Sequence, residues 1–464
     1  MIPERLRPVV EETAALAARF AAAGRSLYLD GGTVRDAIVG RPGGGEPFGP
    51  DADIDLTTDA LPDEIEELVA GWADAVWLQG KRFGTIGCTH RGRQFEITTH
   101  RAESYGPDSR KPEVAFGDDV VADLSRRDFT VNAMAVRLPE LELVDPHGGL
   151  EDLAAFRLRT PLDPETSFSD DPLRMLRAAR FIAGYRLVPD PALETAVGAL
   201  RSRLLIVSAE RIRDELDKLI VLPEPSDGLW FIVRTGLAEE FLPELPALAL
   251  EQDPIHRHKD VLAHTIAVVA KTRPDRILRL AALFHDVGKP RTRQYARNGV
   301  TFHHHDAVGA RLTRSRMQAL RYSAADVDAV SRLVELHLRF HTYKMGWTDS
   351  ALRRYARDAG DLLGELNELT RADCTTRNVN RARALERRMD DLEVRLAALR
   401  EREALDALRP ELSGVEVMAR LGIPQGPEVG RALAFLLDIR IEEGLLGEEE
   451  VGRRLDAWWA REHG

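Results

Sequence analysis

The sequence LDGGTVRD, at residues 29–36, is the most informative part of the N-terminal half. It places two glycines at the end of an apolar run and continues into a helical pattern that carries Arg35. Because glycine has no Cβ, the backbone at Gly31 and Gly32 can approach a phosphate closely. We therefore predict a short strand, a glycine turn and a helix that face a phosphate group.

Acidic and apolar residues alternate in the next segment, DADIDL at residues 51–56. On a strand, Asp51, Asp53 and Asp55 would all point to one face. Carboxylates this close repel one another unless cations lie between them. Mg²⁺ binds oxygen ligands and needs only one or two protein carboxylates, which leaves positions for substrate phosphates. Either motif alone is commonly an ordinary turn or an exposed strand, but the two in this order indicate nucleotidyl transfer.

The composition limits the kinds of partner. The chain of 464 residues is long enough for several domains, and with a net charge of −12 it would hold a nucleic acid through a local basic face. Its two cysteines, Cys88 and Cys374, form neither a disulfide framework nor a zinc pattern, which favours a reducing compartment. We find no signal peptide and no apolar run long enough to cross a membrane, so we expect a cytoplasmic protein without a membrane partner.

The periodicity of apolar residues predicts a small mixed sheet with flanking helices up to about residue 150. Beyond that point strand signals vanish, and helical periodicity continues to the end of the chain. The Gly- and Pro-rich segment at 41–50 is predicted to be a loop. Helices are predicted at 3–23, 33–40 and 61–71, and strands at 26–30, 51–56, 75–78, 85–90 and 94–99.

Further polar residues follow in patterns with two interpretations each. Glu96 is either a third carboxylate beside the aspartates or a solvated strand residue. The segment 124–133 carries Arg126, Arg127, Asp128 and Asn132 at a predicted helix start, where free N–H groups would favour a phosphate or a sugar hydroxyl. The alternative there is an ordinary capped helix.

A row of charged residues at three-residue spacing follows, comprising Asp171, Arg174, Arg177 and Arg180. Side chains three residues apart are neighbours on a helix. An aspartate and an arginine that project together can pair with the edge of a nucleobase, and the other arginines can follow a triphosphate. The alternative is a salt-bridged face exposed to solvent.

Seven motifs in this order resemble the class II tRNA nucleotidyltransferases, which are the CCA-adding enzymes of the poly(A) polymerase/CCA-adding family. They cover roughly the first 220 residues and comprise GGTVRD (31–36), DIDLTT (53–58), FEITTHR (95–101), DLSRRDFTVNAMA (123–135), DPHGGLEDL (145–153), DDPLRMLRAARF (170–181) and AERIRDELDKL (209–219).

The resemblance implies an α+β head of the nucleotidyltransferase fold, followed by an all-α neck, body and HD-type helical domain. We expect the head at residues 1–150 and a helical neck and body, which select the nucleotide and bind RNA, at 151–250. An HD-type metal-binding domain is expected at 251–380 and a helical tail at 381–464.

The resemblance also implies the reaction, which is addition of C, C and A to the 3′ end of tRNA from CTP and ATP with release of pyrophosphate. Asp53 and Asp55 would hold two Mg²⁺ ions, with Glu96 as the third catalytic carboxylate. Gly31, Gly32, Arg35 and Arg127 would contact the triphosphate, Asp128 and Asn132 the ribose, and Asp171 and Arg174 the base, with Arg177 and Arg180 beside them.

Three departures from the family pattern bear on this interpretation. The base-selecting motif begins Asp170-Asp171 instead of Glu-Asp, which leaves the pairing residues intact. The loop at 42–50 is longer than usual, which affects only local geometry. The stretch 102–122, which family members need for the final A, is not shortened, and this favours complete CCA addition over a CC-adding variant.

The second half carries histidines and aspartates in a spacing that resembles an HD-domain metal phosphohydrolase. The expected core ligands are His264, His285, Asp286 and Asp373, and the candidates for a second metal are His305 and His337. Imidazole suits a transition metal such as Mn²⁺ or Ni²⁺. Such a domain is either an active phosphohydrolase or part of the helical body.

Other functions are compatible with parts of the sequence. Poly(A) polymerases and enzymes that add only CC or only A share most of the N-terminal motifs. An HD phosphohydrolase whose N-terminal half merely binds RNA is a further alternative, and the intact Asp53 and Asp55 argue against it.

Overall fold

The computed structural model divides the chain into two compact units, and each is described by itself. The first comprises residues 1–247 with 319–322, and the second comprises 248–318 with 323–464. The described residues are 4–40, 52–104, 113–250, 260–296, 299–342, 347–374, 379–403 and 409–463. The predicted loop at 41–50, Asp51 and part of the stretch 102–122 therefore lie outside the described residues.

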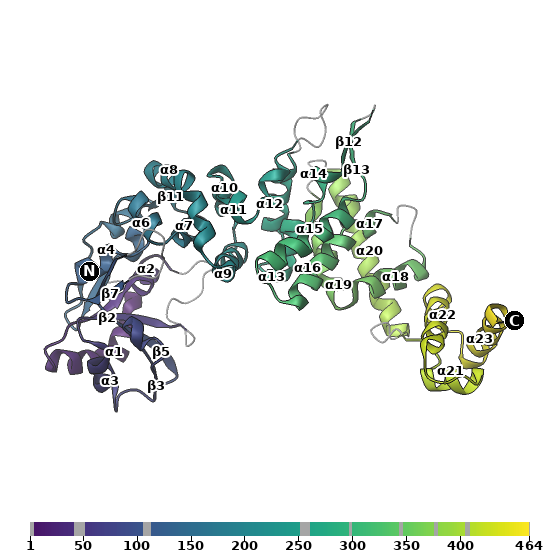
Figure 1. The fold of residues 1–464 in the computed structure, drawn as a ribbon, viewed down its shortest axis with the longest axis horizontal. Coiled ribbons are helices and arrows are strands. Elements are labelled where there is room, and N and C mark those ends of the chain that lie inside the picture. Colours follow the sequence, from purple (N-terminus) through teal and green to yellow (C-terminus); the bar gives the residue numbers. More distant parts are fainter. Residues whose placement is uncertain are drawn as a thin grey trace. The chain divides into compact units, whose positions relative to one another are not determined.

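A mixed sheet of seven strands forms the centre of the head, with the order β3-β4-β5-β2-β1-β8-β9 (Figure 1). The pairing of β2 with β5 is parallel, and the other pairings in this sheet are antiparallel. Its strands are β1 (Leu27–Asp30), β2 (Ile54–Thr58), β3 (Ala75–Trp77), β4 (Thr85–His90), β5 (Arg93–Thr99), β8 (Ala135–Leu138) and β9 (Glu142–Val144). The predicted mixed sheet is confirmed.

Helices α1 (Arg7–Ala22) and α3 (Pro62–Val69) pack against strands of the sheet, while α2 (Gly31–Val39) follows β1 directly. On β2 and β5 the side chains alternate as a strand with one packed face requires, because Ile54, Phe95 and Ile97 are fully buried and Asp55 and Glu96 are exposed. The parallel register sets Asp55 directly opposite Glu96. Helix α4 (Val120–Ser125) and the separate hairpin of β6 (Arg101–Ser104) and β7 (Glu113–Phe116) complete the head.

Three local expectations are wrong. The glycines are the first residues of α2, so they start the helix and do not form a separate turn. The segment 126–132 does not begin an α-helix: α4 ends at Ser125, and a short 3-10 turn (Thr130–Asn132) leads into β8, because the apolar residues that follow pair with β1 in the sheet. Strands also continue beyond residue 150, as β10 (Arg157–Leu158) with β11 (Val188–Pro189) and β12 (Arg293–Ala296) with β13 (Gly299–Phe302). β10 and β11 have two residues each, which is too short to show a period of two, and β12 and β13 have four each, the minimum for such a pattern.

The rest of the first unit is helical around α7 (Leu173–Tyr185), which packs on α9 (Ala209–Ile220) and α10 (Ser226–Arg234). Gly228 lets α10 approach closely, because a Cβ there would lie 2.5 Å from the carbonyl oxygen of Ala179. The other helices are α5 (Gly149–Ala154), α6 (Pro164–Asp170), α8 (Pro191–Leu200) and α11 (Leu237–Phe241).

The second unit is almost entirely helical (Figure 1). Its helices are α12 (Val261–Lys271), α13 (Arg276–Phe284), α14 (Lys289–Thr292), α15 (His305–Ala319), α16 (Ala324–Leu336), α17 (Arg339–Thr342), α18 (Asp349–Ala359), α19 (Leu363–Asp373), α20 (Val379–Glu403), α21 (Gly414–Leu421), α22 (Pro427–Glu443) and α23 (Glu448–His463). The two compact units divide at residue 247. The predicted domain boundaries at 150, 250 and 380 stay predictions. Within the described ranges, no helix is long and apolar enough to span a bilayer.

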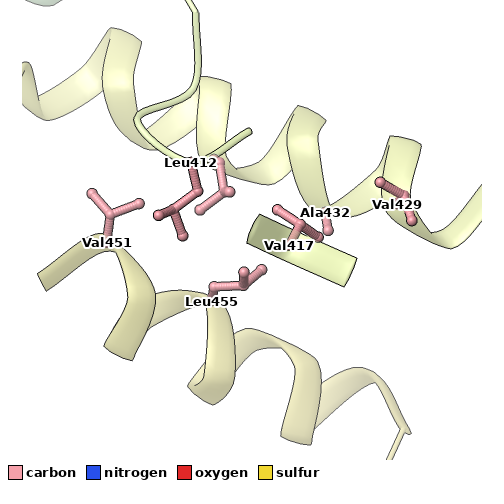
Figure 2. Close-up of a cluster of buried hydrophobic side chains, with 7 residues drawn as sticks. Leu412, Val417, Val429, Ala432, Val451 and Leu455 are labelled. Atoms are coloured by element: carbon pink, nitrogen blue, oxygen red, sulfur yellow. The ribbon is translucent and has the colours of Figure 1, made fainter. Parts of the chain in front are cut away.

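The last three helices enclose an apolar cluster of their own (Figure 2). Leu455 of α23 and Val417 of α21 are fully buried in it, and Trp458 packs against it. Its buried members are Leu412, Val417, Val429, Ala432, Leu436, Val451 and Leu455.

We predict that Leu455→Ala lowers the stability of this cluster by about 2–4 kcal/mol, because a buried leucine loses apolar contacts and leaves a cavity. Hydrogen exchange of the α23 amides measures this effect. Leu445→Ala is the matched control, since Leu445 is 58% exposed and its truncation should change stability by no more than about 0.5 kcal/mol. Equal exchange rates in the two variants would contradict the prediction.

Candidate nucleotide and metal sites

A polar pocket of about 600 Å³ opens in the first unit, between the start of α2, the segment after α4 and the N-terminal part of α7. All ten residues predicted to contact the nucleotide line it, and so does Asp55. The lining residues are Gly31, Gly32, Arg35, Asp55, Arg101, Arg126, Arg127, Asp128, Asn132, Asp171, Arg174, Arg177, Arg180, Phe181 and Arg211.

Asp55 lines this pocket, while the carboxylates of Asp53 and Glu96 lie close enough to affect its pKa but are not among the lining residues. Asp55 lies opposite Glu96 across the β2–β5 pairing, and Asp53 immediately precedes β2. The pKa of Asp55 rises to about 6, mainly because the surrounding protein excludes water from its carboxylate. The charges of Glu96 and Asp53 raise it further, while the charge of Arg127 opposes the shift. A divalent cation between these oxygens would relieve the repulsion, so the donor set fits Mg²⁺.

Arg127 reaches the pocket from a buried network of charges. Its guanidinium donates to the carboxylates of Asp30 and Asp123, the latter at 3.0 Å. Asp123 is fully buried and also accepts hydrogen bonds from Arg126 at 2.8 Å and from the backbone N–H of Arg101 at 3.2 Å. One carboxylate therefore ties the base of the β6–β7 hairpin to two arginines of the pocket.

The two carboxylates of this network titrate in opposite directions. Burial raises the pKa of Asp30 to about 7, although the charge of Arg127 opposes the shift. Burial would also raise the pKa of Asp123, but the Arg127 and Arg126 guanidinium groups hold it well below its usual range. The difference arises because Asp123 has two arginine partners.

The predicted ribose residues are tied to the arginine row. The Oδ2 atom of Asp128 accepts hydrogen bonds from Arg177, the one from Nε at 2.8 Å, and Oδ1 accepts one from Asn132 Nδ2 at 2.8 Å. Burial opposes ionisation of Asp128, but Arg177 and Asn132 hold its pKa well below the usual range. Farther along α7, Arg180 donates to Glu215 at 2.8 Å.

The two residues predicted to select the base both line the pocket, but each is held by its own partners. Arg174 is 9% exposed and donates to Ser167 Oγ at 2.9 Å and to the backbone carbonyl of Arg126. The Asp171 carboxylate accepts from the backbone N–H of Leu173 at 3.1 Å and lies 3.3 Å from an Arg211 nitrogen.

Sequence reasoning missed Arg211, together with Arg101 and Phe181, as lining residues of the pocket, and it named Arg126 only as part of the segment 124–133. The signal for Arg211 was its place inside AERIRDELDKL, one of the motifs that carry the family resemblance.

The second unit holds a separate cluster of histidines and aspartates. His264 Nε2 lies 2.9 Å from an Asp373 oxygen and 3.3 Å from His285 Nε2, which in turn lies 3.2 Å from Asp286. Lys289 donates to Asp286 at 2.6 Å. Among the described residues, two groups of three can each hold a metal ion, and both use Asp286: His264, His285 and Asp286 in one, and Asp286, His305 and His337 in the other.

Three of these rings are oriented in the same way. The Nδ1 atoms of His285, His305 and His337 donate to backbone carbonyls three residues earlier, at 2.7, 2.8 and 2.6 Å. Such a bond leaves the Nε2 lone pair for a metal. Burial lowers the pKa of His305, and it lowers that of His337 to about 4, so both rings are neutral at pH 7. Nitrogen and carboxylate donors in this arrangement fit a transition metal.

Three family models match consecutive parts of the chain. The poly A polymerase head domain matches residues 27–159, and the probable RNA and SrmB-binding site of polymerase A matches residues 187–248. The HD domain model matches residues 261–400.

Relatives of known name match as well. The chain is 38% identical over 357 residues to an A-adding tRNA nucleotidyltransferase of Deinococcus radiodurans, an alignment that covers 73% of this chain and 79% of that protein. It is 39% identical over 215 residues to a CCA-adding enzyme of Geobacillus sp. strain WCH70, covering 46% of this chain and 50% of that protein.

A solved structure shares the fold. It is the crystal structure of the Bacillus stearothermophilus CCA-adding enzyme in complex with CTP, which superposes with a TM-score of 0.71 at 23% identity. The superposition covers 98% of this chain and 99% of that one.

We predict that the free energy of unfolding of Asp30→Asn, relative to that of the wild type, is about 1–3 kcal/mol higher at pH 8 than at pH 5. With a folded-state pKa of about 7, Asp30 retains its proton at pH values where the unfolded chain, with an aspartate pKa of about 3.9, has lost it. Wild-type stability therefore falls as the pH rises from about 4 to about 7, and the asparagine variant has no such loss. Urea unfolding in EDTA at both pH values measures the difference.

Asp128→Asn is the control, because the lowered pKa of Asp128 keeps its carboxylate charged throughout this range and its ion pair is with Arg177 instead of Arg127. The effect of that substitution should be the same at pH 5 and pH 8. A gain for Asp30→Asn that is also independent of pH would contradict the prediction.

Proposed function

Because the chain belongs to the tRNA nucleotidyltransferase family, we propose that it adds C, C and A in turn to the 3′ end of tRNA, using CTP and ATP and releasing pyrophosphate. Nucleotidyl transfer to the tRNA 3′ end is the activity of this family, and the chain is an enzyme of that class. The observation that supports the site assignment is the convergence of all ten predicted nucleotide-binding residues, with Asp55, on one pocket.

In this proposal Asp53, Asp55 and Glu96 hold two Mg²⁺ ions, which would activate the attacking 3′ oxygen and stabilise the leaving pyrophosphate. The backbone at Gly31 and Gly32 and the guanidinium groups of Arg35 and Arg127 bind the triphosphate. Asp123 and Asp30 hold Arg127 in place before the substrate arrives, so little reorganisation is needed on binding.

Base selection is assigned to Asp171 and Arg174. C and A both carry an amino group on the edge that they present for pairing, and a carboxylate accepts a hydrogen bond from such a group. Arg174 supplies donors for ring acceptors, and its bonds to Ser167 and the Arg126 carbonyl restrict its rotation. Arg211 donates to Oδ2 of Asp171 at 3.3 Å. The protein side chains thus replace a nucleic-acid template.

A second candidate is addition of the terminal A alone. Alignments to an A-adding enzyme at 38% identity and to a CC-adding enzyme at 35% identity each span 73% of this chain, whereas the alignment to the CCA-adding relative spans 46% of it. Three labelled tRNAs distinguish the two functions: one without CCA, one ending in C and one ending in CC, each incubated with CTP, ATP or both. A CCA-adding enzyme extends all three to CCA, and an A-adding enzyme extends only the last.

The histidine and aspartate cluster of the second unit is proposed to bind a transition metal, Mn²⁺ or Ni²⁺. This assignment rests on two ligand groups that share Asp286 and on the buried Nε2 atoms of His305 and His337, which have no hydrogen-bond partner among the described residues. A phosphohydrolase activity of this site and the cytoplasmic location expected from the sequence both stay predictions.

We predict that Asp55→Asn lowers nucleotide incorporation by at least about 100-fold, because a lost metal ligand removes several kcal/mol of transition-state stabilisation. Retention of labelled tRNA on a filter should stay within about twofold of wild type, since the arginines and backbone that bind RNA are unchanged. Asp63→Asn is the control, because the Asp63 side chain is 87% exposed on the same head. Incorporation by Asp55→Asn at the wild-type rate would refute the metal assignment.

We predict that the His285→Ala, Asp286→Ala double variant loses bound Mn²⁺ or Ni²⁺ and keeps CCA addition near the wild-type rate. The double substitution removes a ligand from both groups, while the pocket of the first unit is unchanged. Elemental analysis after metal supplementation measures the content. Alanine at the exposed His303 and His304 is the control and should leave the metal bound. A wild type without transition metal, or a folded double variant without CCA addition, would contradict this prediction.

A further inference from the structure

Two aromatic rings of α7 lie beside the Arg35 guanidinium. The guanidinium carbon lies 4.4 Å from the centre of the Tyr185 ring and 5.1 Å from that of Phe181. The two rings are stacked, with centres 5.6 Å apart and an angle of 18° between their planes. A cation over an aromatic face is attracted by the ring, and the attraction increases as water is excluded. Arg35 is 8% exposed, so little water competes with this contact.

The hydroxyl of Tyr185 completes the arrangement. It donates to Asp36 Oδ1 at 2.8 Å, and the same oxygen accepts from Arg35 Nε at 2.8 Å and lies 2.7 Å from Nη2. The other terminal nitrogen of Arg35 donates to Asn132 Oδ1. Burial raises the pKa of Tyr185 well above its usual value, so the hydroxyl keeps its proton and remains a donor. The Arg35 guanidinium is thus restrained by a carboxylate, an amide and two rings.

These contacts connect two elements of the nucleotide pocket. Arg35 and Asp36 lie on α2, the helix that begins with the glycines at the pocket, and a Cβ at Gly32 would lie 3.6 Å from Arg35 Nη2. Tyr185 is the last residue of α7, the helix that carries the row of arginines. The tyrosine therefore joins the triphosphate side of the pocket to the base-selecting side.

We propose that Tyr185 is a positioning residue for nucleotide binding: its ring and hydroxyl hold the Arg35 guanidinium in the orientation in which it binds the triphosphate. The inference rests on the proposed role of Arg35. Because CTP and ATP have the same triphosphate, loss of Tyr185 should weaken the binding of both nucleotides equally. Base selection by Asp171 and Arg174 should be unaffected.

The test compares Tyr185→Leu and Tyr185→Phe by steady-state incorporation into tRNA. Leucine removes both the ring and the hydroxyl, whereas phenylalanine keeps the ring. We expect KM for CTP and for ATP to rise about tenfold in Tyr185→Leu and about threefold in Tyr185→Phe. The CTP-to-ATP ratio of KM values and the exclusion of UTP and GTP should remain as in the wild type.

Tyr355→Phe is the matched control. Tyr355 is a buried tyrosine of the second unit whose hydroxyl donates to Asn367 Oδ1 at 2.8 Å, so the variant loses a comparable hydrogen bond away from the pocket. Its KM values should stay within twofold of the wild type. Thermal unfolding of all variants shows whether a change in KM merely follows a change in stability.

The same measurements in an Arg35→Ala background distinguish the role of Tyr185 from that of Arg35. If Tyr185 acts through Arg35, then Tyr185→Leu should change KM less than twofold once Arg35 is absent. A tenfold effect in both backgrounds, or no effect of Tyr185→Leu where Arg35→Ala raises KM, would overturn the role of Tyr185 and leave that of Arg35 intact. If Arg35→Ala itself leaves KM unchanged, the proposed triphosphate contact is wrong and the role of Tyr185 falls with it.

Discussion

The parallel pairing of β2 with β5 is the constraint on which the head depends. It places Asp55 opposite Glu96 at the pocket while Ile54, Phe95 and Ile97 point into the packed face of the sheet. A shift of one residue in this register would bury the carboxylates and expose the apolar side chains. The burial of three large apolar residues therefore holds two repelling carboxylates in one place. Antiparallel pairing of β1 with β2 then brings the start of α2 beside them, so Gly31, Gly32 and Asp55 line the same pocket.

The pocket gathers several arginines in one place, although the chain as a whole carries a net charge of −12. Four of the five arginines predicted to bind the nucleotide have a carboxylate partner: Asp36 for Arg35, Asp30 and Asp123 for Arg127, Asp128 for Arg177 and Glu215 for Arg180. The fifth, Arg174, is held by Ser167 and a backbone carbonyl instead. A buried guanidinium without a partner would be costly, and these carboxylates offset that cost while fixing the direction of the donors. Phosphate oxygens that enter such a site meet donors that are already oriented.

The histidine cluster of the second unit orients its side chains through hydrogen bonds to backbone carbonyls instead of through ion pairs. Three histidines donate Nδ1–H to the carbonyl three residues earlier, so short-range backbone geometry sets the tautomer at each ring. Helix packing then brings the Nε2 atoms together around Asp286. Burial opposes protonation of His285, yet the charges of Asp286 and Asp373 raise its pKa to about 10, which reflects a surplus of negative charge that a metal cation would neutralise.

The sequence alone determined the mixed sheet, the helical second half and most of the residues that line the pocket, because these depend on side-chain periodicity and on motifs whose chemistry is local. It did not determine the path of 126–132: the segment reads as a capped helix, but pairing of the following residues with β1 makes it a turn into β8. Nor did it indicate which carboxylate meets which arginine. The partner of Arg177 is Asp128, 49 residues away, and Tyr185 meets Asp36 across 149 residues. Such pairs leave no periodic trace in the sequence, because only the packing of α7 against the head brings them within hydrogen-bond distance. That packing decides the orientation of the Arg177 guanidinium and of the Tyr185 hydroxyl.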